Sequence, residues 1–174
     1  MKSHFQMFAA YNAWANNKLY NAAARLSPEA YNRNVGAFFG SMNGTLNHIL
    51  VGDRIWMKRF CGSGDHPNEL DAVLETDFDR LRAEREKEDR RIIDWIDSLT
   101  DEALQQEFSY RTITNPADMN QILGPAVSHL FNHQTHHRGQ AHMILSVLGE
   151  DPPPLDLLYF YRSEDGASHA QFVV

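Results

Sequence analysis

The chain has 174 residues, 43% of them hydrophobic and 22% charged, which suits one soluble globular domain over residues 1–174 with a core that needs no disulfides. No apolar run approaches the roughly 20 residues that span a bilayer, and the N-terminus lacks the apolar stretch of a secretory signal. The net charge of −7 argues against nucleic-acid binding, and the single cysteine, Cys61, indicates a reducing cytoplasm.

Four long helices are predicted from the hydrophobic periodicity, over about residues 3–25, 41–60, 75–98 and 119–148. A capped helical turn is expected after Ser27, and another short helix at 155–161. Residues 100–119 are irregular, with a strand-like alternation at 107–114. The last long helix ends at Gly149, before three prolines, and the tail beyond 161 is expected to be weakly ordered. This order predicts an all-α four-helix bundle with short extra helices in the connections and the tail.

The histidines are concentrated in the last long helix, where five of the nine lie within residues 129–142. His133 and His137 stand four residues apart, so one lies above the other, and both interrupt an otherwise apolar, core-facing stripe. An unsatisfied polar group in a core costs roughly 1–3 kcal/mol, so two stacked imidazoles need a shared partner. A divalent metal ion provides one, because imidazole is its commonest protein ligand.

A candidate third ligand, His48, lies on the second helix between Gly44 and Gly52, each four residues away. A glycine inside a helix costs roughly 1 kcal/mol relative to alanine. That cost is explained if a metal and a substrate need room around His48. Close packing of two helices at small residues explains it equally well, and the glycines alone do not decide between the two.

Spacing also leaves open which histidines of the last helix bind. His129 lies four residues before His133, and His136 three residues after it. His136 falls toward a more polar side, whereas His129 continues the row and is a candidate partner behind the ligands. The remaining histidines near a terminus or in loops are expected at the surface: His4, His66 and His169.

Three segments resemble the DinB family, the DinB/YfiT-like group of metal-dependent four-helix bundle proteins. They are YNAWAN at 11–16, LNHILVGDRIW at 46–56 and HLFNHQTHHRGQ at 129–140. The resemblance covers essentially the whole chain in order and spacing. It implies an up-down-down-up bundle, commonly a homodimer, in which residues 100–118 form the crossover between the third and fourth helices.

The resemblance also implies a divalent metal, with zinc and nickel the first candidates, held by His48, His133 and His137. Three neutral imidazoles leave a metal its full charge and an open position, the pattern of a catalytic site. A metal there lowers the pKa of bound water to about 7 or deprotonates a thiol. Three further residues match recurring family positions, with structural or catalytic roles left open: Asp53, Trp56 and Arg138.

Characterised members of the wider superfamily are similar to thiol-dependent enzymes, including transferases that join bacillithiol or mycothiol to electrophiles, a mycothiol-dependent maleylpyruvate isomerase, and a bundle domain of sulfoxide-synthesising iron enzymes. The leading hypothesis is therefore a metal-dependent transferase of the thiol S-transferase type, which acts on a small molecule and a low-molecular-weight thiol. Arg138 is its candidate for orienting an anionic group.

Two alternatives remain. One is a hydrolase that uses metal-bound hydroxide, although no glutamate is well placed as its base. Asp53 lies about 140° round the helix from His48, so it is expected to pair with an arginine instead of the metal. The other is a non-catalytic dimeric ligand-binding protein. Its pocket would be lined by the aromatic residues Trp14, Trp56, Phe131, Tyr159 and Tyr161.

Overall fold

The computed structural model describes residues 1–170 and is almost entirely helical. The four long helices are α1 (Lys2–Ala23), α3 (Met42–Cys61), α4 (Phe78–Ser98) and α5 (Leu123–Val147). The shorter elements are α2 (Pro28–Asn32), η1 (Ala103–Gln105), β1 (Glu107–Arg111), β2 (Asp118–Ile122), α6 (Leu157–Tyr161) and η2 (Ala167–His169). The all-α fold class is therefore confirmed.

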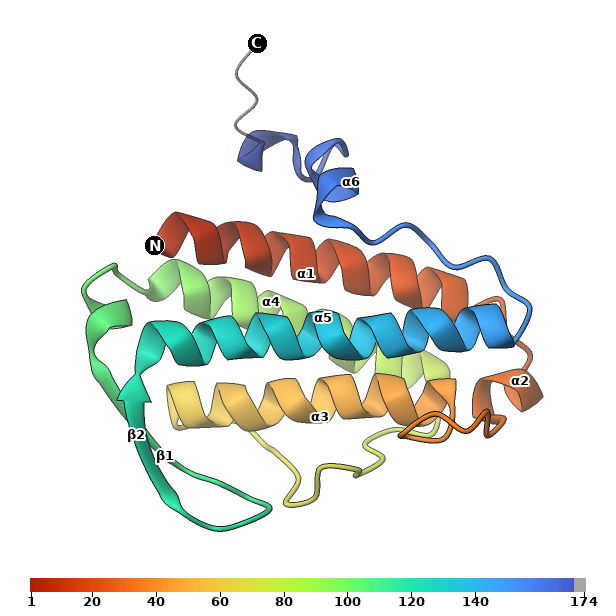
Figure 1. The fold of residues 1–174 in the computed structure, drawn as a ribbon, viewed down its shortest axis with the longest axis horizontal. Coiled ribbons are helices and arrows are strands. Elements are labelled where there is room, and N and C mark those ends of the chain that lie inside the picture. Colours follow the sequence, from red (N-terminus) through yellow and green to blue (C-terminus); the bar gives the residue numbers. More distant parts are fainter. Residues whose placement is uncertain (171–174) are drawn as a thin grey trace.

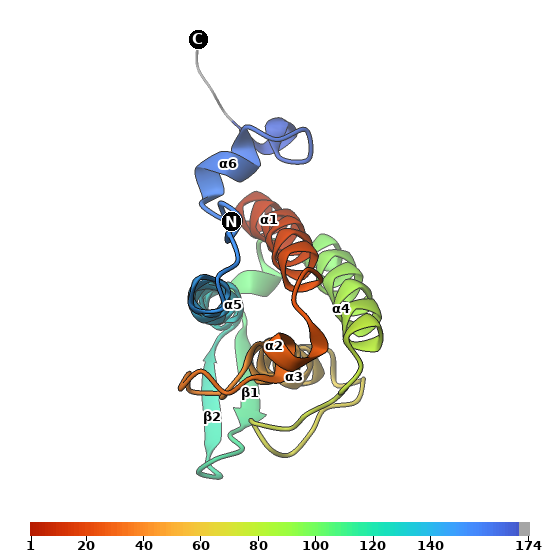
Figure 2. The ribbon, with the colours of Figure 1, turned by 90° about the vertical axis from the view of Figure 1, so that its right-hand side faces the viewer.

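The long helices form an up-down-down-up bundle. Helices α1 and α5 run in one direction and α3 and α4 in the other (Figure 1). Viewed end-on, the four helices surround a common centre, with α1 packed against α4 and α5, and α3 packed against the same two helices (Figure 2). Each helix therefore contributes one face to the interior of the bundle.

Two connections differ from the sequence prediction. Residues 100–122 do join α4 to α5. These two helices are antiparallel, so the end of α4 and the start of α5 lie at the same end of the bundle, and the segment does not run along the length of the bundle (Figure 1). Helices α3 and α4 are parallel instead, so the chain must return along the whole bundle between them. Residues 62–77 make this return.

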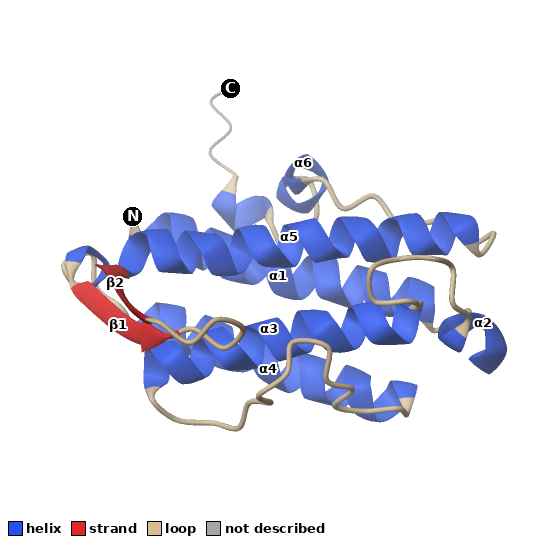
Figure 3. Cartoon of the chain, turned by 60° about the horizontal axis from the view of Figure 1, so that its bottom comes forward, coloured by secondary structure: helices blue, strands red, loops and turns tan. Residues whose placement is uncertain are grey.

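The last long helix begins later than predicted, because residues 118–122 form a strand. Strand β2 pairs with β1 in antiparallel register, Tyr110 opposite Met119, to give the hairpin at the end of the bundle (Figure 3). On β1, the ring of Tyr110 packs against Trp56 of α3 at 5.2 Å between ring centres. This packing and the pairing with β1 hold 118–122 extended. Similarly, α4 begins at Phe78 instead of 75, because the Asp77 side chain caps its first turn.

The other boundaries follow local chemistry. Ser27 and Ser41 cap α2 and α3 through their side chains. Helix α3 ends at Gly62, whose φ of 69° is in the left-handed region that glycine adopts without strain. No helix within residues 1–170 is long and apolar enough to span a membrane.

The C-terminal segment is more ordered than predicted, as far as it is described. Phe160 of α6 is fully buried, and its ring lies 5.8 Å from Tyr11 and 5.7 Å from Trp14, both of α1. The ring of His169 stacks on Phe160 from η2. These contacts secure the segment on α1 as far as 170. Residues 171–174, which the same prediction covered, lie outside the described residues.

Candidate metal centre

The three histidines singled out by the sequence come together between α3 and α5. His48 projects from α3, and His133 and His137 from α5, with one candidate ligand atom of each lying within 4.8 Å of the others. Closest are the Nε2 atoms of His48 and His137, 3.1 Å apart. We call these three side chains the histidine cluster.

Two of the imidazoles are oriented by hydrogen bonds on the far side of the ring. His48 Nδ1 lies 2.7 Å from the carbonyl oxygen of Leu70, and His137 Nδ1 lies 2.8 Å from Oε1 of Gln140. A carbonyl oxygen only accepts hydrogen bonds, so each Nδ1 carries the proton and each Nε2 presents a bare lone pair. Two lone pairs facing each other at 3.1 Å repel unless a cation lies between them.

A divalent metal fits this arrangement. Two nitrogens bound to zinc at 2.0–2.1 Å in tetrahedral geometry are about 3.3 Å apart, close to the separation of the two Nε2 atoms. His133 completes the set, because its Nδ1 is buried and has no hydrogen-bond partner within residues 1–170. The cluster therefore has the donor atoms and the spacing of a three-histidine site.

Both glycines around His48 make room for this site. A Cβ on Gly52 would lie 2.6 Å from Cε1 of His133, and one on Gly44 would lie 2.1 Å from the carbonyl oxygen of Phe39. The ring of Phe39 stacks on His48, with 3.7 Å between centres and 17° between planes. Gly52 thus admits a candidate ligand, and Gly44 admits the loop that covers another. The sequence left open whether the two glycines make room around His48 or allow close packing of two helices. The first explanation accounts for both glycines.

The environment keeps these imidazoles neutral. Burial lowers the pKa of His48 and lowers that of His133 to about 3, where the neighbouring imidazoles act in the same direction. Burial also lowers the pKa of His137 to about 4, although the hydrogen bond that its Nδ1 donates to Gln140 acts in the opposite direction. Only the unprotonated ring binds a metal, so at neutral pH all three are ready to do so.

The other two histidines considered as ligands lie outside the cluster. His129 is exposed, and its ring centre is 5.9 Å from that of His133. His136 is also exposed, with its ring edge-on to His137 at 4.7 Å. Neither contributes an atom to the three-histidine group.

A pocket of about 510 Å³ opens beside the cluster, and we call it the histidine pocket. His48 and His133 form part of its wall, α3 adds Trp56 and Arg59, and the turn of the β1–β2 hairpin closes another side. Its described lining is His48, Gly52, Ile55, Trp56, Arg59, Leu70, Thr112, Ile113, Thr114, Asn115, Ala117, Met119, His129 and His133. The pocket gives a small molecule access to the candidate ligands.

Of the five aromatic residues proposed as pocket lining, Trp56 is the one found in this described lining. Trp14 and Phe131 are buried in the apolar core, Tyr159 is exposed, and Tyr161 packs on Phe160 of its own helix. Among the five aromatic residues, the predicted role in a pocket lining is therefore seen in the histidine pocket for Trp56.

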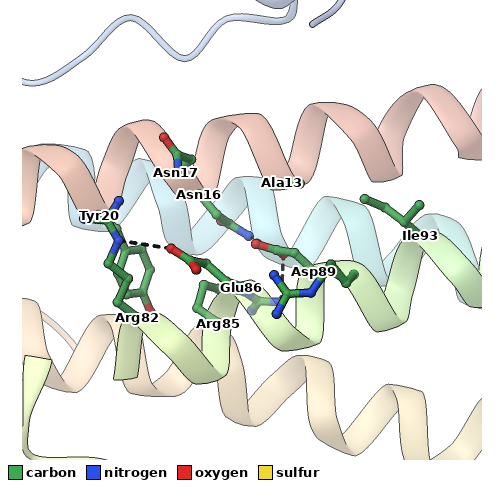
Figure 4. Close-up of a pocket in the computed structure, with 10 residues that line it drawn as sticks. Ala13, Asn16, Asn17, Tyr20, Arg82, Arg85, Glu86, Asp89 and Ile93 are labelled. Atoms are coloured by element: carbon green, nitrogen blue, oxygen red, sulfur yellow. Dashed lines mark hydrogen bonds and ion pairs between the residues drawn. The ribbon is translucent and has the colours of Figure 1, made fainter. Parts of the chain in front are cut away.

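A second buried polar cluster lies at the centre of the bundle. Arg85 of α4 pairs with Asp53 of α3 at 2.5 Å and with Asp89, one turn along its own helix, at 2.9 Å. Asn16 of α1 donates a hydrogen bond to Asp89 at 2.9 Å. Figure 4 shows Arg85 and Asp89 facing Asn16 at the floor of a groove of about 350 Å³ between α1 and α4. The predicted pairing of Asp53 with an arginine is seen here.

Arg138 joins the same cluster from α5. Its guanidinium donates to Oε1 of Gln134 at 3.0 Å and to the side-chain oxygen of Asn12, and Gln134 in turn donates to Asp53. Arg138 is 2% exposed and is not part of the described lining of the histidine pocket. It is therefore not placed to orient a substrate anion there. The full set, which we call the buried ion network, is Asn12, Asn16, Asp53, Arg85, Asp89, Gln134 and Arg138.

Four contributors to the site were missed by the sequence analysis: Phe39, Arg59, Leu70 and Gln140. Gln140 had a usable signal, because it follows His137 by three residues on one helical face. Phe39 lies in a loop between Gly36 and Gly40, and Leu70 orients the His48 ring through its backbone carbonyl. Their proximity to His48 follows from the folded chain.

Fold and site together define a class: a four-helix bundle of up-down-down-up order with three histidines gathered between its second and last long helices. The family model of the DinB family matches residues 1–170, and the chain belongs to this family. It is 26% identical to Protein DinB of Bacillus subtilis (strain 168), over 88% of this chain and 92% of that protein. The family assignment is thereby confirmed.

A solved structure gives the same answer for the fold. A DinB-like protein from Bacillus cereus ATCC 10987 superposes with a TM-score of 0.62 at 15% identity, covering 81% of this chain and 90% of that one. At this identity the likeness concerns the fold alone.

Proposed function

We propose that His48, His133 and His137 bind a divalent metal ion and that the protein is a metal-dependent transferase of the thiol S-transferase type. The observation that carries the metal site is the pair of Nε2 lone pairs facing each other at 3.1 Å, beside the imidazole of His133, whose buried Nδ1 has no hydrogen-bond partner within residues 1–170. The adjoining pocket of about 510 Å³ is the space for the reacting molecules. The transfer chemistry rests on the family resemblance.

The residues around the site divide the remaining tasks. A divalent metal held by His48, His133 and His137 would supply a Lewis-acidic centre that makes a thiol more acidic. The carbonyl of Leu70 and the amide of Gln140 hold two of the ligand rings in place. The imidazole of His129 lies on the pocket wall outside the cluster, and we propose it as the base that accepts the thiol proton.

The hydrolase alternative has less support. A hydrolase of this type needs a general base beside the metal-bound hydroxide, commonly a carboxylate. No aspartate or glutamate lies in the pocket wall formed by residues 1–170. Asp53, considered above only as a metal ligand, is fully buried and paired with Arg85. The hydrolase hypothesis therefore has no carboxylate base in the described pocket wall, and the transferase hypothesis is preferred on the family resemblance.

The remaining features of the proposal follow from the family and the ligand type. Imidazole ligands accept several late divalent metals, and zinc and nickel are the first to test. The substrates are a low-molecular-weight thiol and a small electrophile. We expect a homodimer in the cytoplasm.

The first experiment is elemental analysis of untagged protein purified without added metal. Wild type is compared with His133→Ala and with His136→Ala, which removes an exposed imidazole three residues away. We expect near-stoichiometric metal in wild type and His136→Ala, and none in His133→Ala. Absence of metal from all three, with all three folded, would overturn the metal site.

The second experiment tests the chemistry. The metal-loaded protein is mixed with low-molecular-weight thiols, and thiolate binding is followed by the absorption bands of the nickel- or cobalt-loaded form. Conjugation to chlorodinitrobenzene and other electrophiles is followed in parallel. A metal-loaded protein that neither binds thiols nor conjugates electrophiles contradicts the transferase proposal, and leaves the ligand-binding alternative in its place.

A further inference from the structure

Arg59 is the feature of the histidine pocket that the proposed function does not use. It follows Trp56 by three residues on α3, and its guanidinium carbon lies 4.6 Å from the ring centre of Trp56 and 4.8 Å from that of Tyr110. A guanidinium stacked on aromatic rings keeps its N–H edge free for planar hydrogen bonds. Within residues 1–170 it makes one such bond, a long one of 3.3 Å from Nη2 to the carbonyl oxygen of Arg111.

The charge of this pocket is opposite to that of the protein. The chain carries a net charge of −7, yet the pocket wall within the described chain has no carboxylate. Arg59 is the one lysine or arginine in that wall, and it forms no ion pair with any residue from 1 to 170. Burial lowers its pKa, as expected for a cation without an anionic partner. A bound divalent metal would add further positive charge.

Beside the histidines and the polar hairpin residues Thr112, Thr114 and Asn115, the wall is apolar. Ile55 and Trp56 line it from α3, and Ile113 of the hairpin turn adds to it. Leu70 and Met119 are 41% and 43% exposed although both side chains are large and hydrophobic. Apolar side chains left accessible around a pocket are usually there to contact a ligand.

We propose that the histidine pocket selects a small molecule with an apolar or aromatic body and a carboxylate, and that Arg59 binds this carboxylate. This inference rests on the proposed function, because the molecule is the electrophilic substrate brought to the metal. A carboxylate matches one guanidinium edge through two parallel hydrogen bonds and one unit of charge.

The test is binding without turnover. Isothermal titration calorimetry measures the affinity of the nickel-loaded protein and of the metal-stripped protein for phenylpropionate and for phenylpropionamide, which differ only in the charged group. Arg59→Gln removes the proposed partner. Arg90→Gln is the control, since it removes one exposed positive charge of α4 and leaves the pocket intact.

We expect wild type and Arg90→Gln to bind the carboxylate at least about tenfold more tightly than the amide, and Arg59→Gln to bind the two equally. Metal content should be the same in all three proteins. A carboxylate preference that survives in Arg59→Gln and disappears on metal removal would place the carboxylate on the metal and overturn the role of Arg59. Equal affinities in wild type would overturn the substrate class.

The outcome is independent of the transfer chemistry. If conjugation is never observed but the carboxylate preference depends on Arg59, the binding inference stands and the transferase proposal fails. If conjugation proceeds equally well on neutral and carboxylated electrophiles and is indifferent to Arg59→Gln, the transferase stands and this inference fails.

Discussion

The bundle buries two polar clusters of opposite character. The buried ion network joins all four long helices and contains one arginine for each aspartate, so its charges cancel within the protein: Asp53 and Asp89 against Arg85 and Arg138. The histidine cluster joins only α3 and α5, contains acceptor nitrogens that face one another, and lies on a pocket.

The difference separates a structural role from a functional one. A buried ion network whose charges are balanced contributes to the uniqueness of packing and holds no net charge that a ligand must neutralise. The histidine cluster has lone pairs that face one another without a proton between them, which is the arrangement expected of a cation site. Removal of a residue should therefore destabilise the fold in the first case and, on the proposed function, empty a site in the second.

The largest effect is expected from Arg85→Met. It leaves Asp53 and Asp89 buried without their shared cation, which costs about 3–5 kcal/mol of the free energy of unfolding. Urea denaturation measures the loss. Arg82→Met on the same helix is the control, since its pair with Glu86 is partly exposed and contributes less than about 1 kcal/mol. If Arg85→Met were as stable as wild type, the network would not be what holds the four helices together.

Metal removal is expected to have the next largest effect. Free metal at about 100 times its dissociation constant stabilises the folded state by about 2.7 kcal/mol, so chelation lowers Tm and added metal restores it. Thermal unfolding with and without metal measures this. His133→Ala should unfold at the same temperature in both conditions, and its fold should persist because the ion network is intact. A metal-dependent Tm in His133→Ala would show that the ion binds elsewhere.

Gly52→Ala tests the site through a residue that binds nothing. The added methyl would lie 2.6 Å from the His133 ring, so the ring must move and metal affinity should fall by about tenfold or more. Gly139→Ala on α5 is the matched control, because no atom lies within 4 Å of its Cβ. It should leave metal affinity unchanged and gain up to about 1 kcal/mol of stability. Equal affinities in the two variants would mean that His133 is not a ligand.

The features that the sequence predicts correctly are those that depend on residues only a few positions apart. The helices follow from hydrophobic periodicity, and the pair His133 and His137, like the row Gly44, His48 and Gly52, follows from a spacing of four. The predicted helix from about residue 119 was wrong for residues 119–122, because their pairing with β1, which joins residues distant in space before folding, makes them part of a strand.

The choice of arginine shows where the sequence alone fails. Arg138 stands next to a ligand in the sequence, whereas Arg59 is far from all three histidines. On the helix, however, Arg138 turns toward the bundle centre and Arg59 toward the pocket. The distance of a residue from a motif along the sequence does not reveal which face of the helix the residue occupies. The packing between helices decides whether that face lies toward the bundle centre or toward the pocket.

The smallest effect, taken per pH unit, is expected from acidification of the metal-free protein. His133 has a pKa of about 3 in the folded protein and about 6.5 in an unfolded chain, so below pH 6.5 the unfolded state binds a proton that the folded state does not. The contribution of this imidazole to the stability of the metal-free protein should therefore fall as the pH drops from 6.5 toward 3, by up to about 1.4 kcal/mol per pH unit. Above pH 6.5 this contribution should not depend on pH.

Urea denaturation of metal-free protein at pH values on both sides of this threshold measures the slope. His133→Gln removes one titrating group and should make the profile less steep, with the contributions of His48 and His137 remaining, whereas His136→Gln, at an exposed position, should retain the wild-type slope. In the metal-loaded protein the fall should be steeper, because protons also compete with the metal for the same nitrogens. A slope unchanged in His133→Gln would mean that the fold does not hold this imidazole neutral. His133 would then no longer qualify as the third candidate ligand.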